Sequence, residues 1–146
     1  MSNESHMKLD QKLVDAAIEF IKSRFPNIGD WDGAAAMYTH TGKILVSTYV
    51  ESPNVGTGLC NETGSICEAH KLGEKITASV CVGRSPQGEF EIVTPCGVCQ
   101  ERLFFWGPNV EVAVPDSSNP RKWISKKLIE VQPYYWNKTF LNEFNG

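Results

Sequence analysis

The sequence lacks long hydrophobic runs and carries little excess charge of either sign. No apolar stretch approaches the roughly 20 residues of a membrane-spanning helix, and residues 1–6 lack the charged-then-apolar order of a secretory signal. The net charge is only −3 at pH 7, whereas binding to a phosphate backbone draws most of its energy from Lys and Arg. We therefore expect a cytoplasmic protein that binds neither membranes nor nucleic acid.

Low-complexity segments, internal repeats and linkers are also lacking. The chain has 146 residues, of which 41% are hydrophobic and 21% charged, as in ordinary globular proteins. This length suits one domain with one core. We expect a single domain over residues 1–146, with residues 1–7 as a flexible leader.

Hydrophobic periodicity predicts helices and strands that alternate after an opening hairpin. Helices are predicted over 8–25, 60–75, 96–106 and 123–131, and strands over 33–39, 43–50, 76–82, 89–94 and 110–114. Gly42 tolerates the positive φ of a tight turn between the first two strands. The pattern predicts an α/β fold, with three layers, α/β/α, around a five-stranded mixed sheet.

Three of the five cysteines belong to two local patterns. Cys60-Asn61-Glu62 is the first, and the segment 94–99, with sequence TPCGVC, follows some three dozen residues later. Both are predicted at helix starts, where unpaired N–H groups and the helix dipole favour thiolates. Cys-x-x-Cys with a third ligand leaves the fourth position of a tetrahedral Zn²⁺ open, as a catalytic site requires. We expect Cys60, Cys96 and Cys99 to bind zinc.

Glu62 stands two residues after Cys60 and is predicted to reach a zinc-bound water without ligating the metal. Zinc lowers the pKa of such a water to roughly 7, but the chemistry still needs a group that carries protons. The pairing of [His/Cys]-x-Glu with Pro-Cys-x-x-Cys is the signature of zinc deaminases. The hypothesis is that Glu62 moves protons to the ring nitrogen and the departing ammonia while a cytosine-type ring becomes its uracil form.

On these motifs the sequence resembles the cytidine deaminase superfamily, in the branch of small tetrameric cytidine deaminases and blasticidin-S deaminases. The family's Gly-Ala-Ala strand matches residues 33–36, and its hairpin turn matches Thr41-Gly42. The resemblance covers nearly the whole chain. It implies Zn²⁺ as cofactor, a cytosine nucleoside as small-molecule substrate and a homotetramer as the assembly.

The resemblance also implies substrate-binding residues. Cytidine deaminases end the second strand with Asn-x-Glu, whose side chains hold the ribose; Glu51 matches the Glu, and Tyr49 replaces the Asn. Trp31 falls where those enzymes carry an aromatic that packs on the substrate. Tyr134 and Trp136 look like the Tyr-x-Trp near the C-terminus of fungal-type blasticidin-S deaminase, which makes blasticidin S the alternative to cytidine or deoxycytidine.

Other interpretations of these residues stay open. The Cys96–Cys99 pair is also typical of a redox dithiol, and a zinc protein that binds nucleosides without turnover would use the same ligands. A structural zinc site would need Cys67 or His70 as fourth ligand, about 10 or 15 Å along the helix from Cys60. Cys67 and Cys81 are most simply small core residues.

Overall fold

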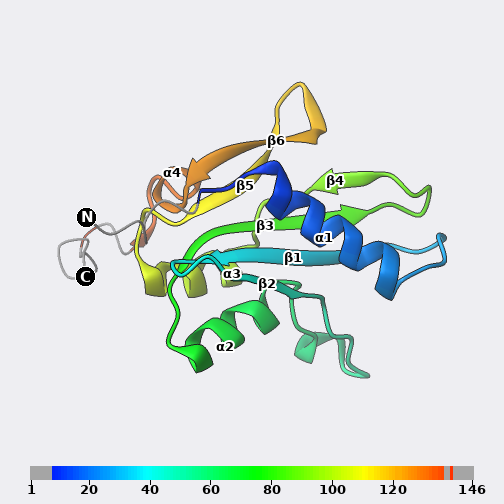
Figure 1. Ribbon diagram of the computed structural model, residues 1–146, viewed down its shortest axis with the longest axis horizontal. Coiled ribbons are helices and arrows are strands. Elements are labelled where there is room, and N and C mark those ends of the chain that lie inside the picture. The colour runs from blue at the N-terminus through cyan, green and yellow to red at the C-terminus, as the bar shows by residue number, and fades with distance from the viewer. Residues whose placement is uncertain (1–7, 137–138, 140–146) are drawn as a thin grey trace.

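The computed structural model describes residues 8–136 and 139, so the expected leader at residues 1–7 lies outside the described residues. Its α-helices and β-strands, labelled in Figure 1, confirm the α/β fold class. In chain order they are α1 (Gln11–Arg24), β1 (Asp32–Thr39), β2 (Ile44–Ser47), η2 (Val55–Thr57), α2 (Thr63–Leu72), β3 (Ile76–Arg84), β4 (Phe90–Ile92), α3 (Gly97–Leu103), η3 (Phe104–Trp106), β5 (Glu111–Asp116), β6 (Asn119–Lys127) and α4 (Leu128–Val131).

Six strands form one mixed sheet in the order β2-β1-β3-β5-β6, with β4 also paired to β3. β3 and β5 are parallel, and the other pairs are antiparallel. Along one edge of β3, β5 pairs with Ala78 and Ser79, and β4 pairs further on, from Val82 to Arg84. The chain then leaves this edge after β4 and enters α3.

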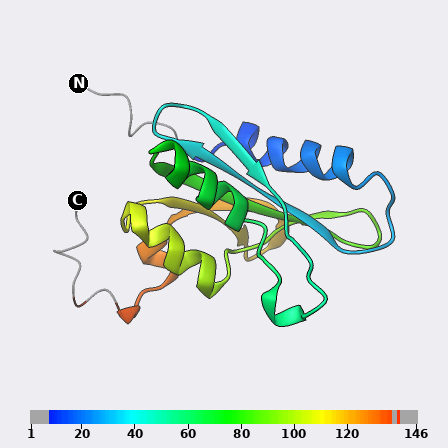
Figure 2. The same ribbon diagram turned by 90° about the horizontal axis from the view of Figure 1, so that it is seen from below.

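Helices cover both faces of the sheet. Leu13, Ala17 and Ile21 of α1 pack in one core cluster with alternate residues of β1 and β3. Ala69 of α2 and Leu103 of α3 belong to the cluster on the opposite face. Figure 2 shows α1 on one side of the sheet and α2 and α3 on the other. Because side chains alternate across a strand, β1 is apolar almost throughout and is buried on both sides. The three layers are as expected.

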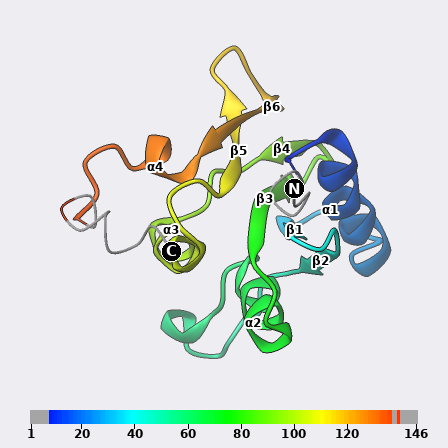
Figure 3. The same ribbon diagram turned by 60° about the vertical axis from the view of Figure 1, so that its left-hand side comes forward.

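The helix expected over 123–131 is wrong for most of its length. The segment continues β6, which pairs with β5, and only the short α4 is helical. The Asp116 carboxylate accepts hydrogen bonds from the backbone N–H and hydroxyl of Ser118 in the connecting turn, and such side-chain contacts favour turns. Pairing with β5 outweighs the helix propensity of the lysines in this segment, so β6 becomes the sixth strand of the sheet. The β5–β6 hairpin projects from the rest of the sheet (Figure 3).

The helices that carry the cysteine motifs are shorter than expected. α2 begins at Thr63 and ends before Gly73, whose φ of 69° is a left-handed helix cap that favours glycine. α3 begins directly after Cys96. Cys67 is exposed on α2, so its expected place in the core is wrong, whereas Cys81 is buried. Among the described helices, none has the length and hydrophobicity to cross a bilayer.

Candidate active site

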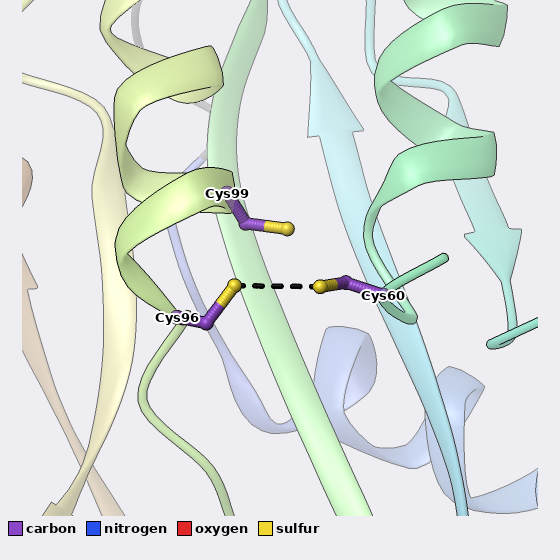
Figure 4. Close-up of side chains that lie close together, drawn as sticks. All are labelled: Cys60, Cys96 and Cys99. Carbon is purple, nitrogen blue, oxygen red and sulfur yellow. Dashed lines mark hydrogen bonds between the residues drawn. The ribbon is translucent and has the colours of Figure 1, made fainter. Parts of the chain in front are cut away.

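The structure brings together three cysteine sulfurs from two loop-to-helix junctions. Cys60 lies in the turn before α2, and Cys96 and Cys99 lie at the start of α3. The three sulfurs all lie within 4.8 Å of one another, and Cys60 Sγ and Cys96 Sγ are 3.4 Å apart. Figure 4 shows the three side chains converging on one point between the helix starts.

The start of α3 stabilises the Cys96 thiolate. Burial alone would raise the pKa of Cys96, but hydrogen bonds from the backbone N–H groups of Cys99 and Val98, together with those from the neighbouring thiols, lower it. The pKa of Cys60 is raised, first by the hydrogen bond between Cys60 and Cys96 and second by burial. Burial also raises the pKa of Cys99. Among the three thiols, Cys96 is therefore the one whose surroundings favour the thiolate.

The donor set fits a tetrahedral dication. Sulfurs held about 2.3 Å from one zinc lie about 3.8 Å apart in a tetrahedron, which agrees with sulfurs within 4.8 Å of one another. Three adjacent thiolates repel one another unless a cation offsets their charge. Among the described residues, the cluster includes no fourth Cys, His, Asp or Glu; Cys67 and His70 are outside it, so the ligand set leaves one position open.

Glu62 is a buried carboxyl group beside the cysteines. It is 3% exposed and immediately precedes α2, rather than lying in its first turn as expected. Burial raises its pKa, and hydrogen bonds with the thiols of Cys81 and Cys99 partly oppose this. A buried carboxyl group whose pKa is raised in this way is suited to accept a proton and pass it on.

A pocket of about 390 Å³ opens over this group. Its lining includes Cys60, Glu62 and Cys96, and also two of the aromatic residues expected to bind substrate, Trp31 and Tyr49. Trp31 is 61% exposed. The pocket therefore joins a proton-carrying group and a metal-binding cluster to aromatic surface.

Tyr49 is held in the pocket wall by two neighbours. Its ring stacks on Phe25 with centroids 5.6 Å apart. Its hydroxyl donates to Asp32 Oδ1 at 2.9 Å, and Asp32 Oδ2 pairs with Arg84 Nη2 at 2.8 Å. Burial, followed by the hydrogen bond to Asp32, raises the pKa of Tyr49 to about 12. The hydroxyl thus stays protonated and directs its lone pairs away from Asp32.

The structure does not bring the other expected substrate residues to the pocket lining. Glu51 is exposed in the loop after β2, near enough to raise the pKa of Tyr49. Tyr134 is 97% exposed. Trp136 lines a separate groove of about 670 Å³ beside α2 and α3, where its indole N–H donates to Glu101.

Several residues that position the site were not expected from the sequence. Asp32 and Asn61 line the pocket. Gln100 donates to the carbonyl of Pro95 at 2.6 Å and so braces the loop before Cys96. Arg102, in the last turn of α3, donates to the Thr63 hydroxyl and ties that turn to the start of α2. Of these residues, only Asn61 lies within the Cys60-Asn61-Glu62 motif, and its place there was the one sign in the sequence that it belongs to the site. The other contacts join segments that are distant in the chain.

Comparison with known proteins places this geometry among deaminases. The solved structure of the cytidine deaminase from Bacillus anthracis is 43% identical, covers 92% of this chain and 94% of that chain, and has a TM-score of 0.84. The cytidine deaminase from Mycobacterium leprae has a TM-score of 0.65 at 20% identity over 86% of this chain and 99% of that chain, which shows the fold alone. The blasticidin-S deaminase of Bacillus cereus is 26% identical over 128 residues, 84% of this chain and 91% of that protein. No family model matches.

Proposed function

The chain belongs to the cytidine deaminase superfamily, and we propose that it is a zinc-dependent hydrolase that deaminates a cytosine nucleoside to the uracil form with release of ammonia. The observation that carries the proposal is the buried Glu62 carboxyl group beside three convergent thiols, of which Cys60 and Cys96 line the same pocket as Glu62. Each part alone has other uses, but together they match the chemistry of hydrolytic deamination.

Cys60, Cys96 and Cys99 would hold the metal. When bound, Zn²⁺ supplies Lewis acidity and lowers the pKa of a coordinated water to roughly 7. The helix start at Cys96, whose pKa the backbone N–H groups lower, favours the ionised ligand that binding requires. Three thiolate ligands need a reducing compartment, and we place the protein in the cytoplasm for this reason.

Glu62 would move the protons of the reaction. It takes a proton from the attacking water, delivers it to ring N3 as C4 becomes tetrahedral, and passes a proton to the departing ammonia. Its burial excludes bulk water from these transfers. General acid–base catalysis of this kind contributes roughly 10²- to 10⁴-fold.

The pocket wall and its surroundings offer groups that suit the ring and the sugar of a nucleoside. Trp31 offers an exposed aromatic surface at the pocket for the ring or the sugar. The hydroxyl of Tyr49 donates to Asp32, so its oxygen accepts a hydrogen bond from a sugar hydroxyl. Glu51, near Tyr49, offers a carboxylate for a second hydroxyl.

Blasticidin S is the second candidate substrate, because of the similarity to the blasticidin-S deaminase of Bacillus cereus. Tyr134 and Trp136, the residues that pointed to this substrate, do not line the pocket of their own chain. The greater identity to the cytidine deaminase from Bacillus anthracis also favours cytidine or deoxycytidine.

Ammonia release and the ultraviolet change from cytosine to uracil test the proposal. Zinc-loaded protein is assayed with cytidine, deoxycytidine, cytosine and blasticidin S. Turnover of cytidine or deoxycytidine above the other two supports the proposal, and preference for blasticidin S selects the alternative. Stoichiometric binding without ammonia would indicate a nucleoside-binding protein, and reduction of insulin in the presence of dithiothreitol would indicate a redox dithiol.

We also propose that the chain folds as one domain over residues 1–146 and assembles as a homotetramer. Exposed apolar side chains such as Val55 and Phe105, which are 91% and 68% exposed, would be covered in such an assembly. Light scattering coupled to size-exclusion chromatography gives the mass, and a single cooperative unfolding transition would support one domain.

A further inference from the structure

Asn61, between Cys60 and Glu62, uses its side chain to join the segment after β2 to β3. Its Oδ1 accepts the backbone N–H of Tyr49 at 2.9 Å. Its Nδ2 donates to Cys81 Sγ in β3 at 3.4 Å. One amide therefore fixes the segment that follows β2 and the middle of β3 relative to the turn that carries Cys60 and Glu62.

The backbone of Asn61 is also held by hydrogen bonds, through Ser47 of β2. Its carbonyl accepts the hydroxyl of Ser47 at 2.6 Å. Ser47 Oγ also accepts the backbone N–H of Ser65 in α2 at 3.0 Å and lies 2.7 Å from Ser65 Oγ. Because the Ser47 proton goes to Asn61, Ser65 is the donor in this hydroxyl pair. The turn before α2 is thus clamped to β2 and to the helix.

Gly33 of β1 makes the space that the Asn61 amide occupies. A Cβ atom at position 33 would lie 2.7 Å from Asn61 Nδ2 and 3.2 Å from Asn61 Oδ1. Any larger residue would push the amide away from its partners. The amide therefore packs directly on the backbone of β1, in addition to its contacts with β3 and with the segment after β2.

We propose that Asn61 is a positioning residue that fixes Glu62 and Tyr49 relative to each other at the pocket, and that Gly33 is required because it admits the Asn61 amide. This inference rests on the proposed function. Asn61 acts through its neighbours: Glu62 follows it directly, and Tyr49 donates to it. Loss of such supporting contacts reduces metal affinity or activity by roughly 10- to 100-fold, and small misplacements of reacting groups have effects of similar size.

Asn61→Ala, assayed with saturating zinc, tests the proposal. We expect kcat to fall roughly 10- to 100-fold and KM to rise, because the amide that fixes the positions of Glu62 and Tyr49 is absent. Asn54→Ala is the matched control: Asn54 Oδ1 accepts the backbone N–H of Gly56 at 3.0 Å in the same loop, but Asn54 does not line the pocket. We expect the control to keep both constants within about twofold of wild type, well below the tenfold lower bound. An Asn61→Ala enzyme with unchanged kcat and KM overturns the proposal, whatever its melting temperature.

Gly33→Ala displaces the amide without removing it. We expect this variant to lower kcat/KM in the wild-type background and to have a smaller effect in the Asn61→Ala background, where no amide is left to displace. Effects that simply multiply in the double variant would contradict the assigned role of Gly33. Asn61→Asp keeps the acceptor for Tyr49 but loses the donor to Cys81, and we expect its KM to stay nearer wild type than that of Asn61→Ala.

Hydrogen exchange of the Tyr49 amide separates this inference from the proposed function. If the wild-type protein deaminates none of the four compounds, the proposed function fails, but the exchange measurement needs no substrate. We expect the Tyr49 amide to exchange faster in Asn61→Ala, while the Val50 amide, bonded to the Leu59 carbonyl at 3.1 Å, keeps its rate. Unchanged exchange at Tyr49 would overturn the positioning role.

Discussion

Replacing Asp32 by Asn removes the negative charge that faces Arg84 beside the pocket. The two side chains are only 8% and 4% exposed, and Arg84 Nη2 lies 2.8 Å from Asp32 Oδ2. Arg84 also donates to the Asn27 carbonyl, but its Nε has no hydrogen-bond partner in the described part of the chain. Asp32→Asn therefore leaves a buried guanidinium group without a counter-charge.

Breaking a buried ion pair from one side costs about 3–5 kcal/mol. For a chain of this length, each kcal/mol lowers the melting temperature by about 2–4 °C, so we expect a fall of roughly 6–20 °C. The matched control is Glu19→Gln. Glu19 pairs with Lys22 at 3.3 Å, but the two side chains are 71% and 56% exposed, and such a pair contributes at most about 1 kcal/mol.

Urea unfolding followed by circular dichroism measures both free energies. The double variant Asp32→Asn/Arg84→Met should be less destabilised than the sum of the two single variants, because the guanidinium group that Asp32→Asn leaves unpaired is absent. If the free energies of unfolding of Asp32→Asn and Glu19→Gln differ by less than about 0.5 kcal/mol, an ordinary effect for a surface substitution, the Asp32–Arg84 pair does not stabilise the fold as a buried ion pair.

Three further predictions concern charge, metal and substrate. Hydrogen bonds, chiefly from the Thr41 hydroxyl, lower the pKa of Glu74 from 4.5 to about 2. Ionised Glu74 therefore stabilises the fold above its ordinary pKa and loses this contribution as the pH falls towards 2; urea unfolding should show the largest difference between wild type and Glu74→Gln at pH 7, and a constant difference down to pH 2 would contradict this. Cys99→Ser should lower the zinc content measured by mass spectrometry, whereas Cys67→Ser, outside the cluster, should keep one zinc per chain; equal zinc content would remove Cys99 from the ligands. Tyr49→Phe keeps the stacking on Phe25 but loses the hydroxyl, so KM for cytidine should rise while kcat changes less; an unchanged KM would exclude a substrate contact.

The cysteine cluster was predictable because its information is local. Cys96 and Cys99 are fixed by one helix start, and the motif that contains Cys60 supplies the third sulfur. The same holds for β1, whose unbroken apolar run indicates a strand covered on both faces.

The rest depends on contacts between distant segments. β6 is a strand because β5 pairs with it, although Arg121, Lys122 and the lysines at 126 and 127 are compatible with a helix. The role of Asn61 follows from its neighbours Tyr49 and Cys81, which are 12 and 20 residues away in the chain. Trp136 was expected at the substrate, but its hydrogen bond to Glu101 holds it beside α3.

The most direct test of the central claim compares wild-type protein with Glu62→Gln at equal zinc content, each assayed for ammonia release from cytidine and deoxycytidine. The substitution keeps the size of the side chain and the three thiol ligands but removes the proton-carrying group. We expect one zinc per chain in both proteins and a loss of turnover of at least roughly 10²-fold in the variant. Near-normal turnover by the Glu62→Gln protein would contradict the proposed role of Glu62.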